Sequence, residues 1–327
     1  MGTAFVTGAT GFVGSHLTRQ LIENGQQVRI LRRENSKVDA IQDLPLEHVI
    51  GSLFDTDLLV EHLRGVDVVF HVAAVASYWR SDTKSIYRVN VDGTRNLLQA
   101  AECAGIGRFI FTSSVAAIGH TRNHFPASEN THFNIDPRIS PYGHSKFLAE
   151  AEVMQAVQRG LDAVTVNPAI IIGPGDLNEI SGSLITEIVR GKLFALPMHG
   201  GTNYIDVRDV VAGHLAAAEK GRTGEKYILG AVNMTHKAFQ RLVCNVVGVT
   251  PPRIMVPGFM MPAAAVVIDI LRRIGVPIPL EGNQLRLSRY DIYVDASKMW
   301  HELHKPQIDI RQSIQDTYQW YKVHGHI

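Results

Sequence analysis

The chain has 327 residues, of which 45% are hydrophobic, and its 32 basic and 31 acidic side chains leave a formal net charge of +1. This composition describes a globular chain long enough for a main domain and a smaller one, and because no basic stripe is visible, nucleic acid is not an expected partner. Two cysteines, Cys103 and Cys244, are too few for a disulfide framework or a thiolate zinc site, and we expect no metal.

The first half of the chain alternates between short runs rich in valine, isoleucine and phenylalanine and segments with helical periodicity. We expect strands near residues 3–7, 27–32, 48–50, 67–72, 107–112 and 162–167, and helices near 12–24, 57–64, 83–104 and 141–159. This alternation is typical of a doubly wound parallel sheet. The sequence therefore predicts an α/β Rossmann domain over residues 1–168, which would bind a dinucleotide.

Beyond Pro168 the alternation loosens, and glycine and proline become more frequent. We expect residues 169–327 to form mainly a smaller, substrate-binding domain, with helices near 182–190, 208–220, 235–247 and 309–322. Within the segment 203–229, two strand-like stretches near 204–207 and 227–229 are expected to return to the main sheet.

The longest uncharged run extends from Ile254 to Ile268 and contains Pro257 and Pro262. It is shorter than the roughly 20 residues that a bilayer-spanning helix needs, so we expect no membrane span. An apolar helix that lines a substrate pocket or covers the core is the favoured interpretation. Because no signal-peptide pattern precedes the first strand, we expect a cytoplasmic protein.

Three glycines spaced three apart follow the first strand and lead into the first helix. Gly8 permits a tight turn, Gly11 lets backbone N–H groups approach a pyrophosphate, and Gly14 lets the helix pack on the strand. The spacing is one residue longer than the familiar G-x-G-x-x-G, but the strand before it and the helix after it support the same function. We predict that this turn binds the cofactor through Gly8, Thr10, Gly11, Phe12, Val13 and Gly14.

Arg32 and Arg33 end the second strand, about 20 residues past the glycine turn, where an NAD-specific site carries an acid for the ribose 2′-hydroxyl. Two guanidiniums at this point suit a 2′-phosphate instead. The sequence therefore favours NADP(H), with NAD(H) as the alternative. The other interpretation is that both arginines are simply a solvated strand end.

Tyr142 and Lys146 lie four residues apart in the expected first turns of a helix that follows Pro141. A lysine ammonium beside a phenol lowers the pKa of the tyrosine from about 10, which would make Tyr142 a general acid and base. A second pair with this spacing, Tyr318 and Lys322, is assigned to a solvated amphipathic helix near the C-terminus. Upstream, Ser114 ends the fifth strand, where its hydroxyl can hold a carbonyl.

Several motifs in order make the chain resemble the extended short-chain dehydrogenases/reductases over nearly its whole length. The matching pieces are residues 7–14 (TGATGFVG), 71–74 (HVAA), 90–94 (NVDGT), 112–114 (TSS), Tyr142 with Lys146, 167–168 (NP) and 173–174 (GP). The dihydroflavonol-4-reductase-like and 3β-hydroxysteroid-dehydrogenase-like members are the most similar, within the wider NAD-dependent epimerase/dehydratase family.

The resemblance implies that Tyr142 is the general acid, that Lys146 lowers its pKa and binds the nicotinamide ribose, and that Ser114 bonds the substrate carbonyl. It also implies that the cofactor contacts Ser52, Leu53, Val72, Ala73, Ala74 and Pro168. At Ser52 the family usually has an aspartate for the adenine, so this chain departs from the pattern there.

The predicted function is an NADP-dependent reductase of a ketone or aldehyde, or a dehydrogenase of the alcohol. A sugar-nucleotide epimerase or dehydratase with retained NAD is the first alternative, and a non-catalytic redox sensor the second. Tyr78 and Trp79 could form aromatic walls for a bulky substrate, or could be ordinary core residues. The apolar positions on several faces of the helices near 83–104 and 141–159 favour a homodimer.

Overall fold

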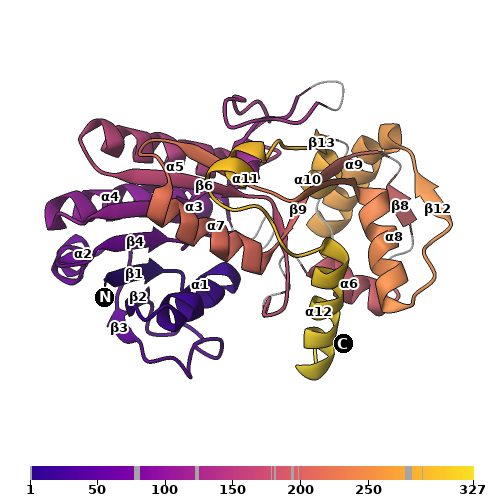
Figure 1. Cartoon of the computed structure of the whole chain (residues 1–327). Helices are drawn as coiled ribbons and strands as arrows, with labels where there is room; N and C mark the ends of the chain where they lie inside the picture. Colours follow the sequence, from indigo (N-terminus) through magenta and orange to yellow (C-terminus); the bar gives the residue numbers. More distant parts are fainter. Residues whose placement is uncertain are drawn as a thin grey trace.

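A parallel sheet of seven strands forms the centre of the larger part of the molecule (Figure 1). The structure is a computed structural model that describes residues 2–76, 82–121, 125–177, 179, 182–192, 195–197, 199–276, 282–288 and 290–327. The strands are β1 (Thr3–Thr7), β2 (Gln27–Arg32), β3 (Glu47–Ile50), β4 (Val68–His71), β5 (Arg108–Thr112), β6 (Ala163–Pro168) and β10 (Lys226–Leu229). Their order, β10-β6-β5-β4-β1-β2-β3, confirms the predicted Rossmann fold.

Helices cover both faces of this sheet because successive side chains of each buried strand point to opposite sides. On β1, Val6 packs in the core that includes α1 (Phe12–Glu23) and α7 (Val207–Lys220). Its neighbour Phe5 packs in the other core, with α2 (Thr56–Leu63), α4 (Gly93–Ala104) and α5 (Pro141–Gln158). Apolar residues at consecutive positions therefore fit a strand that is buried on both faces.

The single helix expected near 83–104 is interrupted. It consists of α3 (Thr83–Tyr87), a π-helical turn (Arg88–Asp92) and α4. The wider turn contains Asn90, whose carbonyl accepts a hydrogen bond from the Thr94 hydroxyl at 2.7 Å. Helical periodicity alone cannot distinguish this local widening from a continuous helix.

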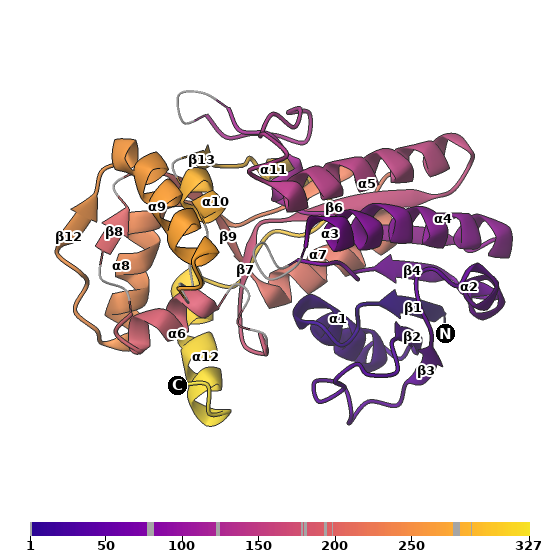
Figure 2. The ribbon, with the colours of Figure 1, turned by 180° about the vertical axis from the view of Figure 1, so that it is seen from behind.

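Most of the remaining elements gather at the end of the molecule away from β3, whereas α11 (Ser297–Glu302) lies beside the main sheet, near β6 (Figures 1 and 2). A second sheet contains β7 (Ile170–Ile172), β9 (Gly201–Asp206), β11 (Val232–Thr235) and β13 (Asp291–Ile292), and β8 (Ala195–Pro197) pairs with β12 (Ile254–Val256). The helices are α6 (Ser183–Val189), α8 (His236–Val247), α9 (Met261–Arg273), α10 (Gly282–Leu287), α11 (Ser297–Glu302) and α12 (Ile310–Val323), with 3₁₀ turns at Val115–Ala117 and Gly258–Met260.

The expectation for the stretch near 204–207 is wrong in part. The stretch near 227–229 does return to the main sheet, as β10 beside β6. Most of the other stretch lies in β9, which pairs with β7, β11 and β13 in the second sheet, and α7 begins at Val207. A short apolar run predicts a strand but not its partners, which are set by contacts with distant parts of the chain.

The apolar run from Ile254 to Ile268 also differs from its interpretation as one covering helix. It forms β12, a 3₁₀ turn and the first half of α9, which has Pro262 in its first turn, where proline is tolerated. Met261 and Ala265 are buried, but Val266 and Val267 are half exposed. No helix in the described part of the chain is both long and apolar enough to cross a membrane.

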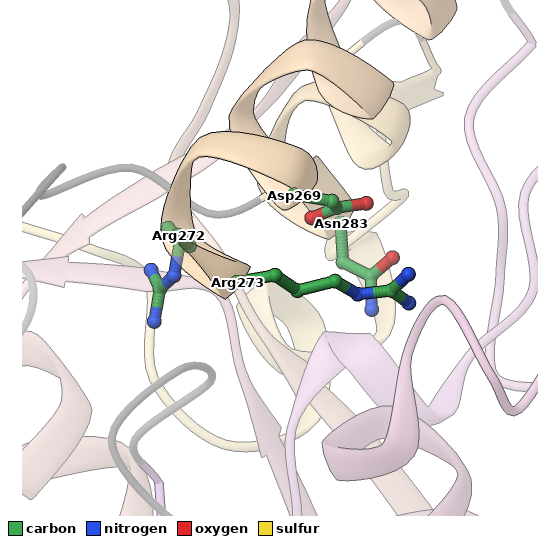
Figure 3. A pocket seen from close by; sticks show the side chains of 4 residues that line it. All are labelled: Asp269, Arg272, Arg273 and Asn283. Carbon is green, nitrogen blue, oxygen red and sulfur yellow. The ribbon is translucent and has the colours of Figure 1, made fainter. Parts of the chain in front are cut away.

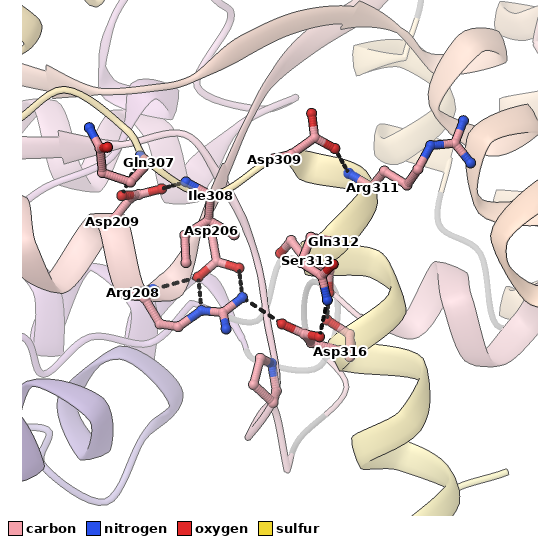
Figure 4. A network of polar contacts seen from close by, with 12 residues as sticks. Asp206, Arg208, Asp209, Gln307, Ile308, Asp309, Arg311, Gln312, Ser313 and Asp316 are labelled. Atoms are coloured by element: carbon pink, nitrogen blue, oxygen red, sulfur yellow. Dashed lines mark hydrogen bonds and ion pairs between the residues drawn. The ribbon is translucent and has the colours of Figure 1, made fainter.

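An ion-pair network joins α7, which packs on the main sheet, to α12 in the second part of the molecule (Figure 4). Asp206 caps α7 and accepts hydrogen bonds from the backbone and guanidinium of Arg208, which also binds Asp316 on α12 at 2.8 Å. One turn on, Asp209 accepts from the backbone N–H groups of Gln307 and Ile308 at 2.9 and 3.0 Å. Because Asp206 and Asp209 are almost completely buried, these bonds fix the two parts of the molecule against each other.

Candidate active site

The glycine turn between β1 and α1 is shaped for close approach of backbone. Gly8 has a positive φ of 77°, and a Cβ placed there would lie 2.6 Å from the backbone nitrogen of Ala73. A side chain at Gly14 would collide with the carbonyl of Gly8. Gly11 caps α1 without a side-chain bond, so the N-terminal N–H groups of this helix have no capping side chain. The turn therefore fits the pyrophosphate of a dinucleotide.

The segment after β4 lies beside this turn and is held by buried polar contacts. The Thr7 hydroxyl accepts from the N–H of Ala73 at 3.2 Å and bonds His71 at 2.7 Å, and the other ring nitrogen of His71 bonds Thr94 at 2.9 Å. Burial lowers the pKa of His71 to about 3, so the ring is neutral and its role is structural. These bonds place Val72, Ala73 and Ala74 along the glycine turn.

The two arginines at the end of β2 differ in their surroundings. The Arg32 guanidinium donates to His48 at 2.9 Å and to the carbonyls of Arg33 and Glu34 at 3.3 Å. Arg33 is exposed, and its guanidinium has no partner among the described residues. Arg33 is therefore the cation that is free to bind a phosphate, and Arg32 lies beside it.

The predicted adenine contacts lie after β3. Leu53 is buried and its carbonyl accepts from Asn96 at 2.7 Å, whereas the Ser52 hydroxyl accepts from the backbone of Phe54 at 3.3 Å. Pro168 ends β6, two strands away in the sheet from β4. The structure thus distributes the predicted cofactor residues along one edge of the sheet, where open α/β sheets bind ligands.

Tyr142 and Ser114 meet at the end of β5. Ser114 lies just beyond the strand, where its hydroxyl accepts from the N–H of Ala116 at 3.1 Å and hydrogen-bonds the phenol of Tyr142. Tyr142 stands in the first turn of α5, which Ser140 caps and Pro141 begins. Only 8% of its surface is exposed. The phenol of Tyr142 and the Ser114 hydroxyl, which was predicted to hold a carbonyl, therefore lie together at the end of β5.

Lys146 lies one turn after Tyr142 on α5 and is 2% exposed. Its ammonium donates to the Thr112 carbonyl at 2.7 Å and lies 4.8 Å above the ring of Phe111. Burial lowers the pKa of Lys146 to about 7, against an opposing effect of Glu150. A buried ammonium is costly, so the amine is close to losing its proton at neutral pH.

The predicted fall in the pKa of Tyr142 is wrong for this structure. Burial raises the pKa of the phenol to about 12, and the hydrogen bond with Ser114 opposes that rise only in part. Burial removes the water that would stabilise the phenolate, and the ammonium of Lys146 hydrogen-bonds the Thr112 carbonyl. Tyr142 is therefore protonated at neutral pH and is a proton donor in this state.

Glu150 is a buried residue of the site that the sequence analysis missed. It lies one turn after Lys146 and accepts hydrogen bonds from Ser113 at 2.5 Å and from Asn167 at 2.6 Å, with Lys226 at 3.4 Å. The same Asn167 amide also donates to the carbonyl of Ser114 at 3.0 Å. The spacing of four from Lys146 was the available signal, because residues 142, 146 and 150 share one face of a helix.

Asn90, like Glu150, holds neighbouring parts of the site in place through hydrogen bonds of its side chain. Its side chain accepts from the N–H of Val75 at 2.8 Å and donates to the Ser145 hydroxyl at 3.0 Å. It thereby joins the segment after β4 to α5, the helix that carries Tyr142 and Lys146. The motif at residues 90–94 thus contributes hydrogen bonds that hold α5 and the segment after β4 together.

Two further predictions concern residues elsewhere. Tyr318 and Lys322 lie on α12, with the ammonium 5.4 Å from the phenol ring, and α12 buries Ile314 and Tyr321 against the second part of the molecule, as expected of an amphipathic helix. Tyr78 and Trp79 lie outside the described residues.

Comparison with known proteins identifies the family. The model of the NAD dependent epimerase/dehydratase family matches residues 4–230. The chain belongs to this family. A Synechocystis protein provisionally named a dihydroflavonol 4-reductase is 40% identical over 331 residues, covering 99% of this chain and 95% of the relative. The sterol demethylase protein B of Methylococcus capsulatus is 32% identical over 332 residues, covering 99% and 100%.

Among solved structures, the crystal structure of gox2253 matches with a TM-score of 0.88 at 35% identity, over 100% of both chains. The predicted resemblance to extended, dihydroflavonol-4-reductase-like members of the epimerase/dehydratase family is confirmed. As a member of it, the protein is an NAD(P)-dependent oxidoreductase that acts on alcohol and carbonyl groups.

Proposed function

We propose that the protein is an NADP(H)-dependent reductase of a ketone or aldehyde, reversible toward the alcohol, that uses Ser114, Tyr142 and Lys146. The observation that carries this proposal is the contact between Tyr142 and Ser114 at the end of β5, one helical turn from a buried lysine. A protein that only bound a dinucleotide would have no chemical use for a buried phenol bonded to a serine.

The residues divide the reaction between them. Ser114 holds the substrate carbonyl, and Tyr142, protonated because its pKa is about 12, donates its proton to the carbonyl oxygen. The nicotinamide, when bound, supplies the hydride to the carbonyl carbon. Lys146 in its ammonium form stabilises the phenolate that remains, one turn away on the same helix face.

The cofactor residues follow the same proposal. The turn at Gly8, Gly11 and Gly14 holds the pyrophosphate, and Arg33, with Arg32 beside it, binds the 2′-phosphate that distinguishes NADP from NAD. The exposed Arg33 guanidinium supports this preference. We also propose a cytoplasmic homodimer that pairs through α4 and α5, where Phe147 and Met154 are partly exposed.

The first experiment is calorimetric titration of dinucleotide-free protein with NADPH, NADP, NADH and NAD, after the purified sample has been checked for retained dinucleotide. Exchangeable NADPH that binds more tightly than NADH supports the reductase and leads to a screen of carbonyl substrates. NAD that stays bound through purification would refute it in favour of a sugar-nucleotide epimerase or dehydratase.

A further inference from the structure

The second part of the molecule exposes a concentrated set of apolar side chains. Phe259, Ile274, Val267, Ile270 and Val266 are exposed to 82, 70, 54, 52 and 50%. All five come from the 3₁₀ turn before α9, from α9 itself, or from the residue that ends it. We call these five side chains the α9 apolar face. Single exposed apolar residues are ordinary, but a contiguous group of this size marks an interaction surface.

The spacing along α9 makes this face continuous. Val266, Ile270 and Ile274 are four residues apart, and Val267 stands beside them, so all four lie on one side of the helix. Met261 and Ala265 point to the other side and are buried. Since Val266, Val267 and Ile270 on the outward side are also apolar, this helix does not show the polar outer face of an ordinary surface helix.

The charges around the face are mainly cationic. Between residues 253 and 288 the sequence has four arginines, Arg253, Arg272, Arg273 and Arg286, and two acids, Asp269 and Glu281. Asp269 is already paired with Arg286 at 2.8 Å. In the whole chain, by contrast, 32 basic residues are balanced by 31 acidic ones. The local excess therefore belongs to this surface rather than to the protein as a whole.

The end of α9 also borders a pocket of about 420 Å³, lined by Asp269, Arg272, Arg273 and Asn283 (Figure 3). Arg273 extends from the helix end toward Asn283, whereas Arg272 points away on the other side. An anionic headgroup at this pocket would meet the Arg273 guanidinium while the neighbouring helix face met acyl chains.

We propose that the α9 apolar face docks on the surface of an anionic lipid bilayer. A helix that lies in the interface buries its apolar side in the acyl boundary and places its arginines against lipid phosphates. The arginines at the end of α9 match the anionic phosphates of such a bilayer, and this charge match favours a lipid surface over a second copy of the chain. The proposal goes beyond the catalytic function and does not depend on it.

The surface is connected to the catalytic helix. Arg286 on α10 bonds Asp269 on α9 at 2.8 Å, and Asn283 on α10 donates to the carbonyl of Arg138 at 3.0 Å. Arg138 lies four residues before Tyr142. A docked α9 would therefore place the start of α5 near the bilayer, on the side from which an apolar carbonyl compound could arrive.

Vesicle flotation tests the proposal on the full chain. The protein is mixed with vesicles of phosphatidylcholine alone or with vesicles that also contain about 30% phosphatidylglycerol. We expect flotation with the anionic vesicles and little with the neutral ones. Ile270→Glu should abolish flotation, and Arg273→Ala should weaken binding roughly fivefold at low salt.

The matched control is Val323→Glu, which also places a carboxylate on an exposed apolar position, 80% exposed on α12. This variant should float like the unmodified protein. Both glutamate variants should keep the unmodified melting temperature and NADPH binding, because neither side chain is buried.

Three outcomes would overturn the proposal. The first is the absence of flotation with anionic vesicles. The second is equal flotation of Ile270→Glu and the unmodified chain. The third is self-association in sedimentation velocity that Ile270→Glu removes, which would make a second copy the occupant of this face. A loss of carbonyl reduction with retained flotation would instead refute the catalytic proposal and leave this one standing.

Discussion

Lys146 and Glu150 lie one turn apart on the buried face of α5, and the carboxylate opposes the fall that burial causes in the pKa of the lysine. Glu150 also holds Ser113 at the end of β5 and Asn167 at the end of β6. One carboxylate thus fixes the two strand ends that frame the site and helps keep the neighbouring amine protonated.

Glu150→Gln should move the basic limb of the pH profile of kcat/KM for carbonyl reduction to lower pH. Without the carboxylate charge, the pKa of Lys146 falls further below about 7, so less ammonium remains to stabilise the phenolate. Each unit of that fall would reduce kcat/KM roughly tenfold on the basic side. Glu152→Gln is the control, since Glu152 pairs with Arg95 on the outer side of α5. An unshifted limb in Glu150→Gln would show that the carboxylate acts only in folding.

Tyr142→Phe should reduce turnover by about 10²–10⁴-fold while NADPH binding persists, because the proton donor is lost but the glycine turn is intact. Steady-state kinetics and calorimetry on the same sample measure the two quantities. Tyr318→Phe, in the second Tyr-x-x-x-Lys sequence, should have unchanged turnover. Equal rates for Tyr142→Phe and the unmodified enzyme would exclude Tyr142 as the acid.

Arg33→Ala should weaken NADPH binding by about 10- to 100-fold, the range for a lost charge-assisted contact, and change NADH binding little. The dissociation constants for both cofactors come from fluorescence titration. Lys37→Ala, a nearby exposed cation, serves as the comparison. If both cofactors weakened equally, Arg33 would not be reading the 2′-phosphate.

The free energy of unfolding should fall as the pH drops below 6.5. Burial lowers the pKa of His71 to about 3 and that of His214 and His236 to about 4. Between those values and 6.5 the unfolded chain binds protons that the folded chain does not, so acid favours unfolding. Three neutral rings would give a slope of up to about 4 kcal/mol per pH unit. Urea unfolding at pH 7, 6 and 5 measures it, and a flat profile would contradict the buried neutral state.

Met154→Glu should convert the proposed homodimer into a monomer at micromolar concentration. Met154 and Phe147 lie two turns apart on α5 and are 40 and 36% exposed, so both can face a partner helix. Sedimentation equilibrium gives the mass, with Val323→Glu as the control for an added surface charge. A protein that is monomeric before substitution would end this proposal.

Much of the main sheet was predictable because each of its elements carries a local signal. Buried strands appear as apolar runs, and the spacing of Gly8, Gly11 and Gly14 has meaning only between a strand and a helix. Four helices after Pro168, α6, α7, α8 and α12, were also expected within about two residues of their bounds, whereas the 13-residue helix α9 was not placed. The shorter strands of the second part carry no such signal, since their pairing depends on distant residues.

The sequence could predict that Ser114, Tyr142 and Lys146 lie close together, but it predicted neither the buried Glu150 nor the electrostatics of the site. Ser114, Tyr142 and Lys146 could be placed together because they follow from strand ends and from helical spacing. The pKa of Tyr142 depends on how much water the fold removes, and Lys146 hydrogen-bonds the carbonyl of Thr112. Neither the burial of the Tyr142 phenol nor the hydrogen-bond partner of the Lys146 ammonium can be obtained from the order of residues along the chain.

The last strand of the main sheet, β10, comes from residues that follow β7, β8 and β9 in the chain. During synthesis, β6 therefore leaves the ribosome about sixty residues before its outer neighbour β10 does. All six residues of β6 are buried in the folded protein. A fragment that stops at Pro168 would display that strand as an open edge and would be prone to aggregate. The dinucleotide-binding half is consequently not a detachable unit, and attempts to exchange the substrate-binding half between relatives must carry residues 226–229 with the first half.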